Sequence, residues 1–391
     1  MTVVKERTSL VSHLQCAACD KRFDVHERNT FASCAQCQKS PLLTHYHLKA
    51  GTDREEIRLE ERSMWRYWPL LPLHDSKHKV SLGEGWTPLL KVNRLAARHG
   101  LANLLIKDES ANPTGSFKAR GLSMAVSKAK ELGIDTCIVP TAGNAGGALS
   151  AYCAKAGMKA IVVMPSHTPE AFKKECRYFG AQLIEVDGLI SDCARKVAVI
   201  KNTVDCFDIS TMKEPYRLEG KKTMGYEIAE QMNWKLPDVI LYPTGGGTGL
   251  IGMWKAFHEM KAMGWITGKL PRMIAVQAEN CKPIVMSYEG HQQNASHYMG
   301  SATMANGLAV PHPFAEKLIL QVIRQSHGTA LAVTDDAIRG AMKEIAAAEG
   351  MLVCPEGAAL WPALKHLIDQ GEVEREETIL LLNTGSAYKY L

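Results

Sequence analysis

From Asn103 to the end of the chain, short apolar runs alternate with segments of helical pattern. The apolar runs have the length of buried strands and lie at residues 104–109, 136–140, 159–165, 181–187, 239–243, 273–278 and 377–385. Near-continuous apolar strands, each followed by a helix, are typical of a parallel sheet that is covered on both faces. The sequence therefore predicts an α/β fold with more than one sheet region.

The size and composition of the chain are those of a globular protein of two or three domains. It has 391 residues, of which 46% are hydrophobic and 22% charged, enough for sizeable cores. The formal net charge of +5 is small for this length, so we expect no nucleic-acid or membrane partner. The N-terminus lacks the apolar core of a signal peptide, and no run of about 18 apolar residues occurs. We expect a cytoplasmic protein.

Four of the eleven cysteines lie in the first 37 residues, as two Cys-x-x-Cys pairs. Cys16 and Cys19 are separated from Cys34 and Cys37 by 14 residues of polar, turn-like sequence. Four such thiolates can bind Zn²⁺ tetrahedrally, and a segment too small for its own core gains stability from the metal. We therefore expect a structural, zinc-ribbon-like segment over residues 1–48. The alternative is four unrelated free cysteines.

Residues 49–80 have the pattern of a connector between this segment and a core at 81–391. The connector contains a run of acidic and basic residues and then an aromatic cluster, Trp65, Tyr67 and Trp68. Such a cluster usually packs against a neighbouring domain or subunit. We assign it to packing and not to catalysis.

The loops that follow the strands are where chemistry is expected, because ligands of open parallel sheets bind at the carboxyl ends of the strands. After the strand at 104–109, a turn at 112–115 leads into an amphipathic helix with Lys118 in its first turn. A lysine at that place faces the positive end of the helix dipole, which lowers its pKa and favours the neutral, nucleophilic amine. Lys118 is thus a candidate for Schiff-base chemistry; the alternative is a solvated surface lysine.

Three further strand-ending loops are rich in small and polar residues. The loop at 141–147 contains Asn144 among glycines and alanines, and its helix-start amides suit a carboxylate. The loop at 244–249 has four glycines and two threonines, which suits a phosphate monoester, and it has neither Walker nor dinucleotide spacing. Residues 383–386 place two hydroxyls in the same crevice. Each loop taken alone could also be a tight packing turn.

Together these parts describe a site for pyridoxal 5'-phosphate. Lys118 would bind the aldehyde, residues 244–249 the phosphate, and Asn144 an oxygen of the ring. Thr384 or Ser386 would contact the ring nitrogen. A hydroxyl there does not keep the pyridine fully protonated, which favours elimination and replacement at the β or γ carbon over transamination.

These motifs resemble those of a known enzyme family. The sequence KDESANPTGSFKARG at 107–121 is similar to the lysine motif of the fold type II (tryptophan-synthase β-like) pyridoxal-phosphate enzymes, and most of all to that of the threonine synthases. The likeness covers nearly the whole chain, including the cysteine ribbon, MWRYWPLLPL, SLGEGWTPLL and CPEGAA at 354–359. It implies two open, twisted, mostly parallel sheet domains and a homodimer. Residues of about 122–205 would form the smaller, mobile domain.

The resemblance also implies roles for individual residues. Lys118 would form the Schiff base and act as general base and acid, with Phe117 beside the cofactor ring. Asn144 would contact the 3'-oxygen of the ring and Thr384 its nitrogen. The phosphate would be held by Gly245, Gly246, Gly247, Thr248 and Gly249. The substrate carboxylate would be bound by Thr141, Ala142, Gly143, Asn144 and Ala145. Glu356 would lie near the active site, either as a catalytic group or as a buried structural carboxylate at a helix start.

The implied reaction is that of a lyase converting O-phospho-L-homoserine and water to L-threonine and phosphate. Ala119 follows the lysine where threonine synthases commonly have aspartate, and residues 145–147 (AGG) stand where they usually have serine or threonine. A serine/threonine ammonia-lyase and a cysteate-synthase-like β-replacement enzyme are therefore alternatives. Basic residues near the asparagine loop would favour a phosphorylated substrate, and the candidates nearby in sequence are Arg120, Lys173 and Lys174.

A hypothesis of another class is a non-catalytic regulator that uses the cysteine ribbon to contact protein or nucleic acid. The small net charge and the intact lysine motif argue against it.

Overall fold

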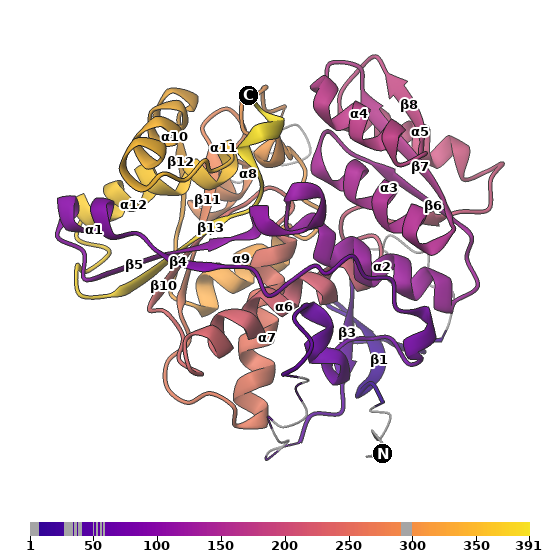
Figure 1. Cartoon of the computed structure of the whole chain (residues 1–391), viewed down its shortest axis with the longest axis horizontal. Coiled ribbons are helices and arrows are strands. Elements are labelled where there is room, and N and C mark those ends of the chain that lie inside the picture. Colours follow the sequence, from indigo (N-terminus) through magenta and orange to yellow (C-terminus); the bar gives the residue numbers. More distant parts are fainter. Residues whose placement is uncertain are drawn as a thin grey trace.

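The computed structural model describes residues 8–26, 34, 37, 41–49, 51, 54, 57, 59–290 and 299–391. Figure 1 shows the chain arranged around two twisted sheets, with a smaller sheet near the N-terminus. The fold is α/β, as the alternating pattern predicts. In the described ranges, no helix combines the length and the apolar character that crossing a bilayer requires.

The larger sheet has six strands in the order β12-β11-β10-β13-β5-β4. All of its pairings are parallel except that of β4 with β5. Its strands are β4 (Leu89–Lys91), β5 (Asn103–Asp108), β10 (Val239–Pro243), β11 (Arg272–Ala278), β12 (Ala330–Val333) and β13 (Thr378–Asn383). Because β10, β13 and β5 are neighbours, the loops that follow these three strands meet at one edge of the sheet.

Helices cover both faces of this sheet (Figure 1). On one face α12 packs against β10, β12 and β13, with α10 and α1 next to it, and on the other face α9 packs against β11 and α7. The helices of this part are α1 (Asn93–His99), α6 (Tyr216–Gln231), α7 (Thr248–Met263), α8 (Pro283–Tyr288), α9 (Glu316–Gln325), α10 (Asp335–Glu349), α11 (Pro355–Ala358) and α12 (Leu360–Asp369).

The second sheet has four parallel strands in the order β8-β7-β6-β9. These are β6 (Thr136–Pro140), β7 (Lys159–Pro165), β8 (Gln182–Val186) and β9 (Phe207–Asp208), accompanied by α2 (Lys118–Glu131), α3 (Asn144–Ala156), α4 (Glu170–Tyr178) and α5 (Ile190–Ile200). Successive side chains of a strand point to opposite faces. Ile161 and Val163 of β7 therefore pack with Val197 of α5, whereas Val162 and Met164 pack in the cluster of α2 and α3. Burial on both faces explains why these strands are apolar throughout.

The N-terminal segment forms a three-stranded antiparallel sheet that packs on α6. Its strands are β1 (Val11–Cys16), β2 (Arg22–Phe23) and β3 (Leu42–Tyr46). The Tyr46 hydroxyl donates to Glu219 Oε2 at 2.6 Å, and Lys255 of α7 donates to the Thr44 carbonyl at 2.5 Å. Short 3-10 helices complete the chain: η2 (Met64–Leu70), η3 (Ser76–His78), η4 (Glu109–Ala111), η5 (Pro113–Gly115), η7 (Asn306–Leu308) and η8 (Ala387–Lys389).

The aromatic cluster of the connector packs within this chain. Trp65, Tyr67 and Trp68 are all buried. The indole N–H of Trp65 donates to Glu84 at 2.7 Å, and the Tyr67 hydroxyl donates to Glu230 at 2.6 Å. The prediction that the cluster serves packing is confirmed, and its partners Glu84 and Glu230 belong to the same chain.

Candidate active site

The lysine loop and the loop after the last strand lie side by side, because β5 and β13 are neighbours. Lys118 is the first residue of α2, as predicted. The N–H of Phe117 donates to the Thr384 carbonyl at 3.0 Å, and the N–H of Ser386 donates to the Gly115 carbonyl at 2.8 Å. The structure thus brings the predicted Schiff-base lysine and the predicted ring-nitrogen contact to the same edge of the sheet.

The glycine loop follows β10 and is packed so closely that side chains do not fit. A Cβ atom added to Gly245 would meet the Gly307 carbonyl at 2.2 Å, and one added to Gly249 would meet the Tyr242 hydroxyl at 2.0 Å. α7 begins at Thr248, and the first N–H groups of a helix have no acceptor inside the helix. These amides and the helix dipole suit a bound phosphate. The loop therefore fits the role predicted for it.

Two glycines let α2 and α6 approach each other closely at the site. A Cβ atom on Gly220 would meet the Arg120 carbonyl at 2.1 Å, and one on Gly121 would meet the Arg217 carbonyl at 2.9 Å. Both contacts are with backbone atoms, which cannot move aside as a side chain can. The close approach sets the start of α2, with the lysine, against the α6 turn that carries Arg217 and Lys221.

Three cations therefore gather at the start of α2. Nζ of Lys118 lies 4.0 Å from the centre of the Phe117 ring, and Nζ of Lys221 lies 4.9 Å from the same ring. Burial and the charge of Arg217 lower the pKa of Lys118 to about 7. Burial and the charges of Arg217 and Lys118 lower the pKa of Lys221 well below its ordinary value. An excess of buried positive charge of this kind favours the binding of anions.

The hydrogen bonds of Arg217 and Lys221 show how these cations are held. Lys221 Nζ donates to Thr248 Oγ1 in the glycine loop at 2.5 Å. One terminal nitrogen of Arg217 donates to the Ile209 carbonyl at 2.6 Å. The Nε atom of Arg217 is buried and has no hydrogen-bond partner among the described residues. Because buried donors are usually paired in folded proteins, this donor is available to an acceptor on a bound ligand.

Arg217 and Lys221 are not among the basic residues predicted from the sequence, which are Arg120, Lys173 and Lys174. The guanidinium of Arg120 is occupied by ion pairs with Glu109 and Glu227. Lys173 pairs with Glu185, and Lys174 is exposed. The available signal was the spacing in YRLEGKKT (216–223), where Arg217 and Lys221 are four residues apart and share one helix face.

The asparagine loop also reaches the site. Asn144 is the first residue of α3, and its Nδ2 atom lies 3.5 Å from the position of a Cβ atom built on Gly385. Thr141 Oγ1 accepts a hydrogen bond from the Gly143 N–H at 3.1 Å, which shapes the turn. Ala145 is buried, so its methyl group serves packing. Ala119, the other departure from the family pattern, is likewise buried in an apolar cluster.

Glu356 and Cys354 also lie near Lys118, close enough to influence its pKa. Glu356 is buried in the first turn of α11 and accepts hydrogen bonds from the Gly307 N–H at 2.7 Å and the Tyr390 hydroxyl at 2.9 Å. These partners match the structural role that the sequence left open for it. Cys354 Sγ lies 3.7 Å from Thr384 Oγ1, and burial raises the pKa of this thiol, so it is neutral at physiological pH.

Two buried hydroxyls indicate that the site is shaped for a polar ligand. Thr114 Oγ1 and Ser116 Oγ, both in the lysine loop, have no hydrogen-bond partner among the described residues. Such groups are rare in folded proteins unless a ligand or water satisfies them. With the glycine loop and the three cations, the residues present fit the phosphate and the aldehyde of pyridoxal phosphate.

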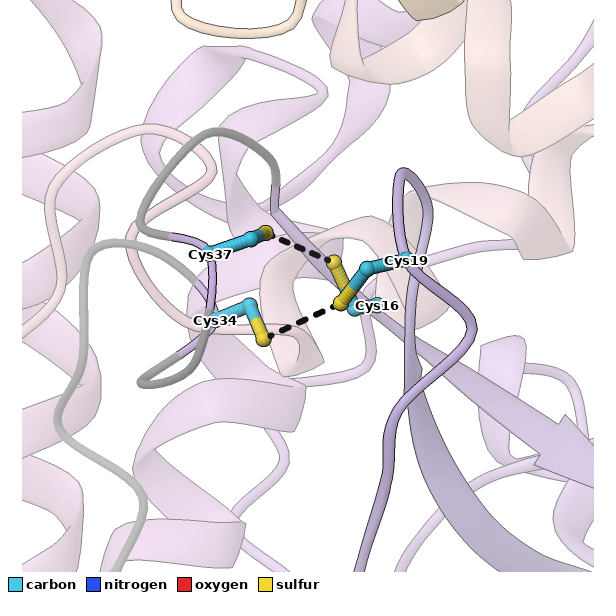
Figure 2. Close-up of side chains that lie close together, drawn as sticks. All are labelled: Cys16, Cys19, Cys34 and Cys37. Atoms are coloured by element: carbon cyan, nitrogen blue, oxygen red, sulfur yellow. Dashed lines mark hydrogen bonds between the residues drawn. The ribbon is translucent and has the colours of Figure 1, made fainter.

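The four N-terminal cysteines form a separate cluster, which Figure 2 shows. Their sulfur atoms all lie within 4.8 Å of one another. Cys16 Sγ is 3.6 Å from Cys37 Sγ, and Cys19 Sγ is 3.6 Å from Cys34 Sγ. Tetrahedral zinc with Zn–S bonds of about 2.3 Å places its sulfurs about 3.8 Å apart. The cluster therefore could hold a metal ion.

Comparisons with known proteins indicate the family of this chain. The sequence profile of the family "Pyridoxal-phosphate dependent enzyme" matches residues 80–385. The chain is 34% identical to the threonine synthase of Methanocaldococcus jannaschii over 376 residues, which cover 96% of this chain and 92% of that protein. It is 35% identical to the threonine synthase of Methanosarcina acetivorans over 378 residues, with the same coverage of both chains.

The solved structures include similar folds at lower identity. The processed form of threonine deaminase isoform 2 from Solanum lycopersicum superposes with a TM-score of 0.65 at 22% identity, covering 86% of this chain and 91% of that one. The family profile, the coverage of the relatives and the shared fold lead to one conclusion: the chain belongs to the pyridoxal-phosphate dependent enzymes of fold type II.

Proposed function

We propose that this enzyme is a carbon-oxygen lyase of the threonine synthase type, which converts O-phospho-L-homoserine and water to L-threonine and phosphate. The relatives named threonine synthase, at 34% and 35% identity over 96% of the chain, support this reaction. The structural observation that carries the proposal is the position of Arg217, next to Lys118 and Lys221 and with a buried Nε atom that lacks a partner among the described residues.

The number of cations distinguishes this reaction from that of a serine/threonine ammonia-lyase. The glycine loop, with Lys221 bonded to Thr248, accounts for the phosphate of the cofactor. Arg217 then remains for a second anion, which the phosphate of phosphohomoserine would supply. An ammonia-lyase that acts on serine or threonine has no second phosphate to bind. The buried, incompletely paired guanidinium therefore favours a phosphorylated substrate.

The bound cofactor would supply an electron sink for the substrate carbons. Lys118 would take up and return protons at the α, β and γ carbons, because a pKa of about 7 keeps both of its forms populated at neutral pH. Arg217 would stabilise the charge that develops on the departing phosphate. The amides at the start of α3 would bind the substrate carboxylate. Water would then add at the β carbon.

We assign the remaining roles as the sequence predicts them. Phe117 would pack beside the cofactor ring, Asn144 would contact its 3'-oxygen and Thr384 its nitrogen, while residues 244–249 would hold the phosphate. We also propose that the four cysteines bind a structural zinc ion, supported by their sulfur-sulfur distances of 3.6 Å. A cytoplasmic homodimer, in which residues of about 122–205 close over the substrate, completes the proposal.

Parallel turnover assays test the reaction. The purified enzyme with its cofactor is given O-phosphohomoserine, O-phosphoserine, threonine or serine, and inorganic phosphate, ammonia and threonine are measured. We expect equal amounts of phosphate and threonine from O-phosphohomoserine. Ammonia from threonine, with no phosphate released from O-phosphohomoserine, would overturn the proposal in favour of the ammonia-lyase.

A substitution at Arg217 tests the observation that carries the proposal. We expect Arg217→Met to lower kcat/KM for O-phosphohomoserine by about 10²- to 10³-fold, as the loss of one charge-stabilising donor does. Inorganic phosphate, used as a product inhibitor of the holoenzyme, should also bind more weakly. Arg339→Met, on the exposed surface of α10, is the matched control and should change neither value. An unchanged inhibition constant for phosphate in the Arg217 variant would contradict the assignment.

A further inference from the structure

The last residues of the chain contact both large parts of the fold, next to the lysine and asparagine loops. Ser386 forms an isolated antiparallel β-bridge with Val353, which precedes α11 in the sequence. The Tyr390 hydroxyl donates to Glu356 of α11, and the Tyr390 ring packs edge-on against Phe172 of α4, with ring centres 5.5 Å apart. This segment therefore connects the six-stranded sheet part with helix α4 of the four-stranded sheet part.

Lys389 forms hydrogen bonds with three residues outside this segment. Its Nζ atom donates to Glu175 Oε2 at 2.7 Å and Oε1 at 2.9 Å, to the Thr114 carbonyl at 2.7 Å and to Asn144 Oδ1 at 3.2 Å. The side chains of Lys389 and Glu175 are only 17% and 15% exposed. A pair shielded to this degree holds its geometry better than an ion pair in open solvent. The contacts fix the ammonium beside the asparagine loop.

The contact with Asn144 decides which way its amide points. An asparagine side chain has one carbonyl oxygen, which accepts, and one amino group, which donates, whereas an ammonium only donates. Lys389 can therefore face only Oδ1 of Asn144 favourably. The amino group is then turned to the other side, where Nδ2 lies 3.5 Å from the Cβ position built on Gly385.

Glu175 holds the ammonium in place from α4. A Cβ atom added to Gly147 would meet Glu175 Oε2 at 1.9 Å, so the carboxylate lies on the first turn of α3 in the space that this glycine leaves. A carboxylate at the start of a helix is stabilised by the helix dipole. Gly147, Glu175, Lys389 and Asn144 thus form one connected unit, assembled from α3, α4 and the end of the chain.

We propose that Lys389 is a positioning residue: it fixes the amide of Asn144 so that Nδ2 donates a hydrogen bond to the 3'-oxygen of the bound cofactor. Glu175 keeps the Lys389 ammonium in register. The inference rests on the place of Asn144 in the proposed function. A hydrogen bond donated to the ring oxygen favours its anionic form, so Lys389 acts on the ionisation of the cofactor through Asn144.

The absorption spectrum of the bound cofactor tests this without any substrate. The visible-absorbing form of the cofactor has an anionic ring oxygen, and the near-ultraviolet form has a neutral one. We expect Lys389→Met to lower the ratio of the visible to the near-ultraviolet form by about 2- to 10-fold, as the loss of one hydrogen bond does. Asn144→Ala should give the same change, and the double variant should add nothing to it. Lys343→Met, on the exposed face of α10, is the control and should keep the wild-type ratio.

Two further variants keep the test decisive if Lys389→Met folds poorly. Lys389→Arg retains a donor-only cation and should preserve the wild-type ratio, whereas Glu175→Gln should shift it in the same direction as Lys389→Met. Effects of Lys389→Met and Asn144→Ala that add in the double variant would overturn the proposal. So would an unchanged spectrum in either single variant. This test measures no turnover. A finding that the enzyme acts on another substrate would therefore refute the proposed function without affecting the outcome of this test.

Discussion

The amine of Lys221 lies 2.5 Å from the hydroxyl of Thr248, so a lysine of α6 reaches into the glycine loop at the start of α7. Lys221 is buried, and burial together with two neighbouring cations lowers its pKa well below the ordinary value. A phosphate bound in the loop would place an anion next to this ammonium. Lys221 is therefore expected to strengthen the binding of the cofactor through its phosphate.

Lys221→Met should weaken cofactor binding by about 10- to 100-fold, since a hydrogen bond to a charged group contributes about 1.5–3 kcal/mol. Titration of the apoenzyme with pyridoxal phosphate, followed by protein fluorescence, measures the change. Pyridoxal without phosphate is the matched ligand, and its affinity should be the same for the variant and the wild type. An equal loss for both ligands would show that Lys221 acts on the fold and not on the phosphate.

The pKa of Lys118 predicts how fast the cofactor attaches at different pH. Burial and the charge of Arg217 lower this pKa to about 7. The attacking species is the neutral amine, whose fraction falls about tenfold for each pH unit below the pKa. The rate of cofactor attachment to the apoenzyme, measured by stopped-flow absorbance, should therefore rise from pH 5 to about 7 and level off above. Arg217→Met should move this midpoint to higher pH, and a midpoint near the ordinary lysine value of about 10.4 in the wild type would refute the assignment.

The buried ion cluster of Glu227, Arg120 and Lys107 predicts that acid lowers the stability of the fold. Burial acts to raise the pKa of Glu227, but the charges of Arg120 and Lys107 outweigh it and lower the pKa from 4.5 to about 2. Because this pKa is depressed in the folded chain, its contribution is present above about pH 4.5 and is lost as the pH falls toward 2. The free energy of unfolding should decrease by about 3 kcal/mol over this window from Glu227 alone.

Urea unfolding between pH 2 and 7 measures that contribution. Glu227→Gln should already be destabilised by about 3–5 kcal/mol at pH 7, because it leaves buried cations without their partner, and should show a shallower acid dependence. Glu376→Gln, at an exposed position, should reproduce the wild-type curve. Parallel pH curves for Glu227→Gln and wild type would show that this carboxylate does not titrate as assigned.

The cysteine cluster predicts a metal content. We expect about one zinc ion per chain, because four thiolates complete a closed tetrahedral site. Cys16→Ser should lose the metal and lower the melting temperature, and a strong chelator should do the same to the wild type. Cys193→Ser, at a buried thiol in α5, should retain the metal. Zinc-free wild-type protein with an unchanged melting temperature would rule out the metal site.

The strands that are buried on both faces could be predicted from the sequence. The strands expected at 136–140, 159–165 and 239–243 have the bounds of β6, β7 and β10, because burial on both faces demands continuous apolar residues. The site loops followed from their place after strands. The lysine, asparagine and glycine loops could be recognised as candidate site loops because each motif is local.

The sequence did not reveal contacts between distant segments. All residues of α6 from Tyr216 to Ala229 are buried, although several are charged, so the helix has no amphipathic pattern to recognise. Several of its charged side chains contact residues far along the chain, as when Glu219 pairs with Lys255 and accepts a hydrogen bond from Tyr46. Lys389 and Asn144 are 245 residues apart, and no local signal connects them.

Helix α6 contacts both the N-terminal cysteine segment and the candidate active site. Glu219 accepts a hydrogen bond from Tyr46 of the cysteine-containing segment, and Arg217 and Lys221 lie next to Lys118 and Thr248 of the candidate site. A catalytic core freed of its N-terminal segment would leave the buried charge of Glu219 without that tyrosine. The cysteine segment is therefore packed onto α6, and a chain shortened by this segment would expose to water the ion pairs of Glu219 with Lys222 and Lys255.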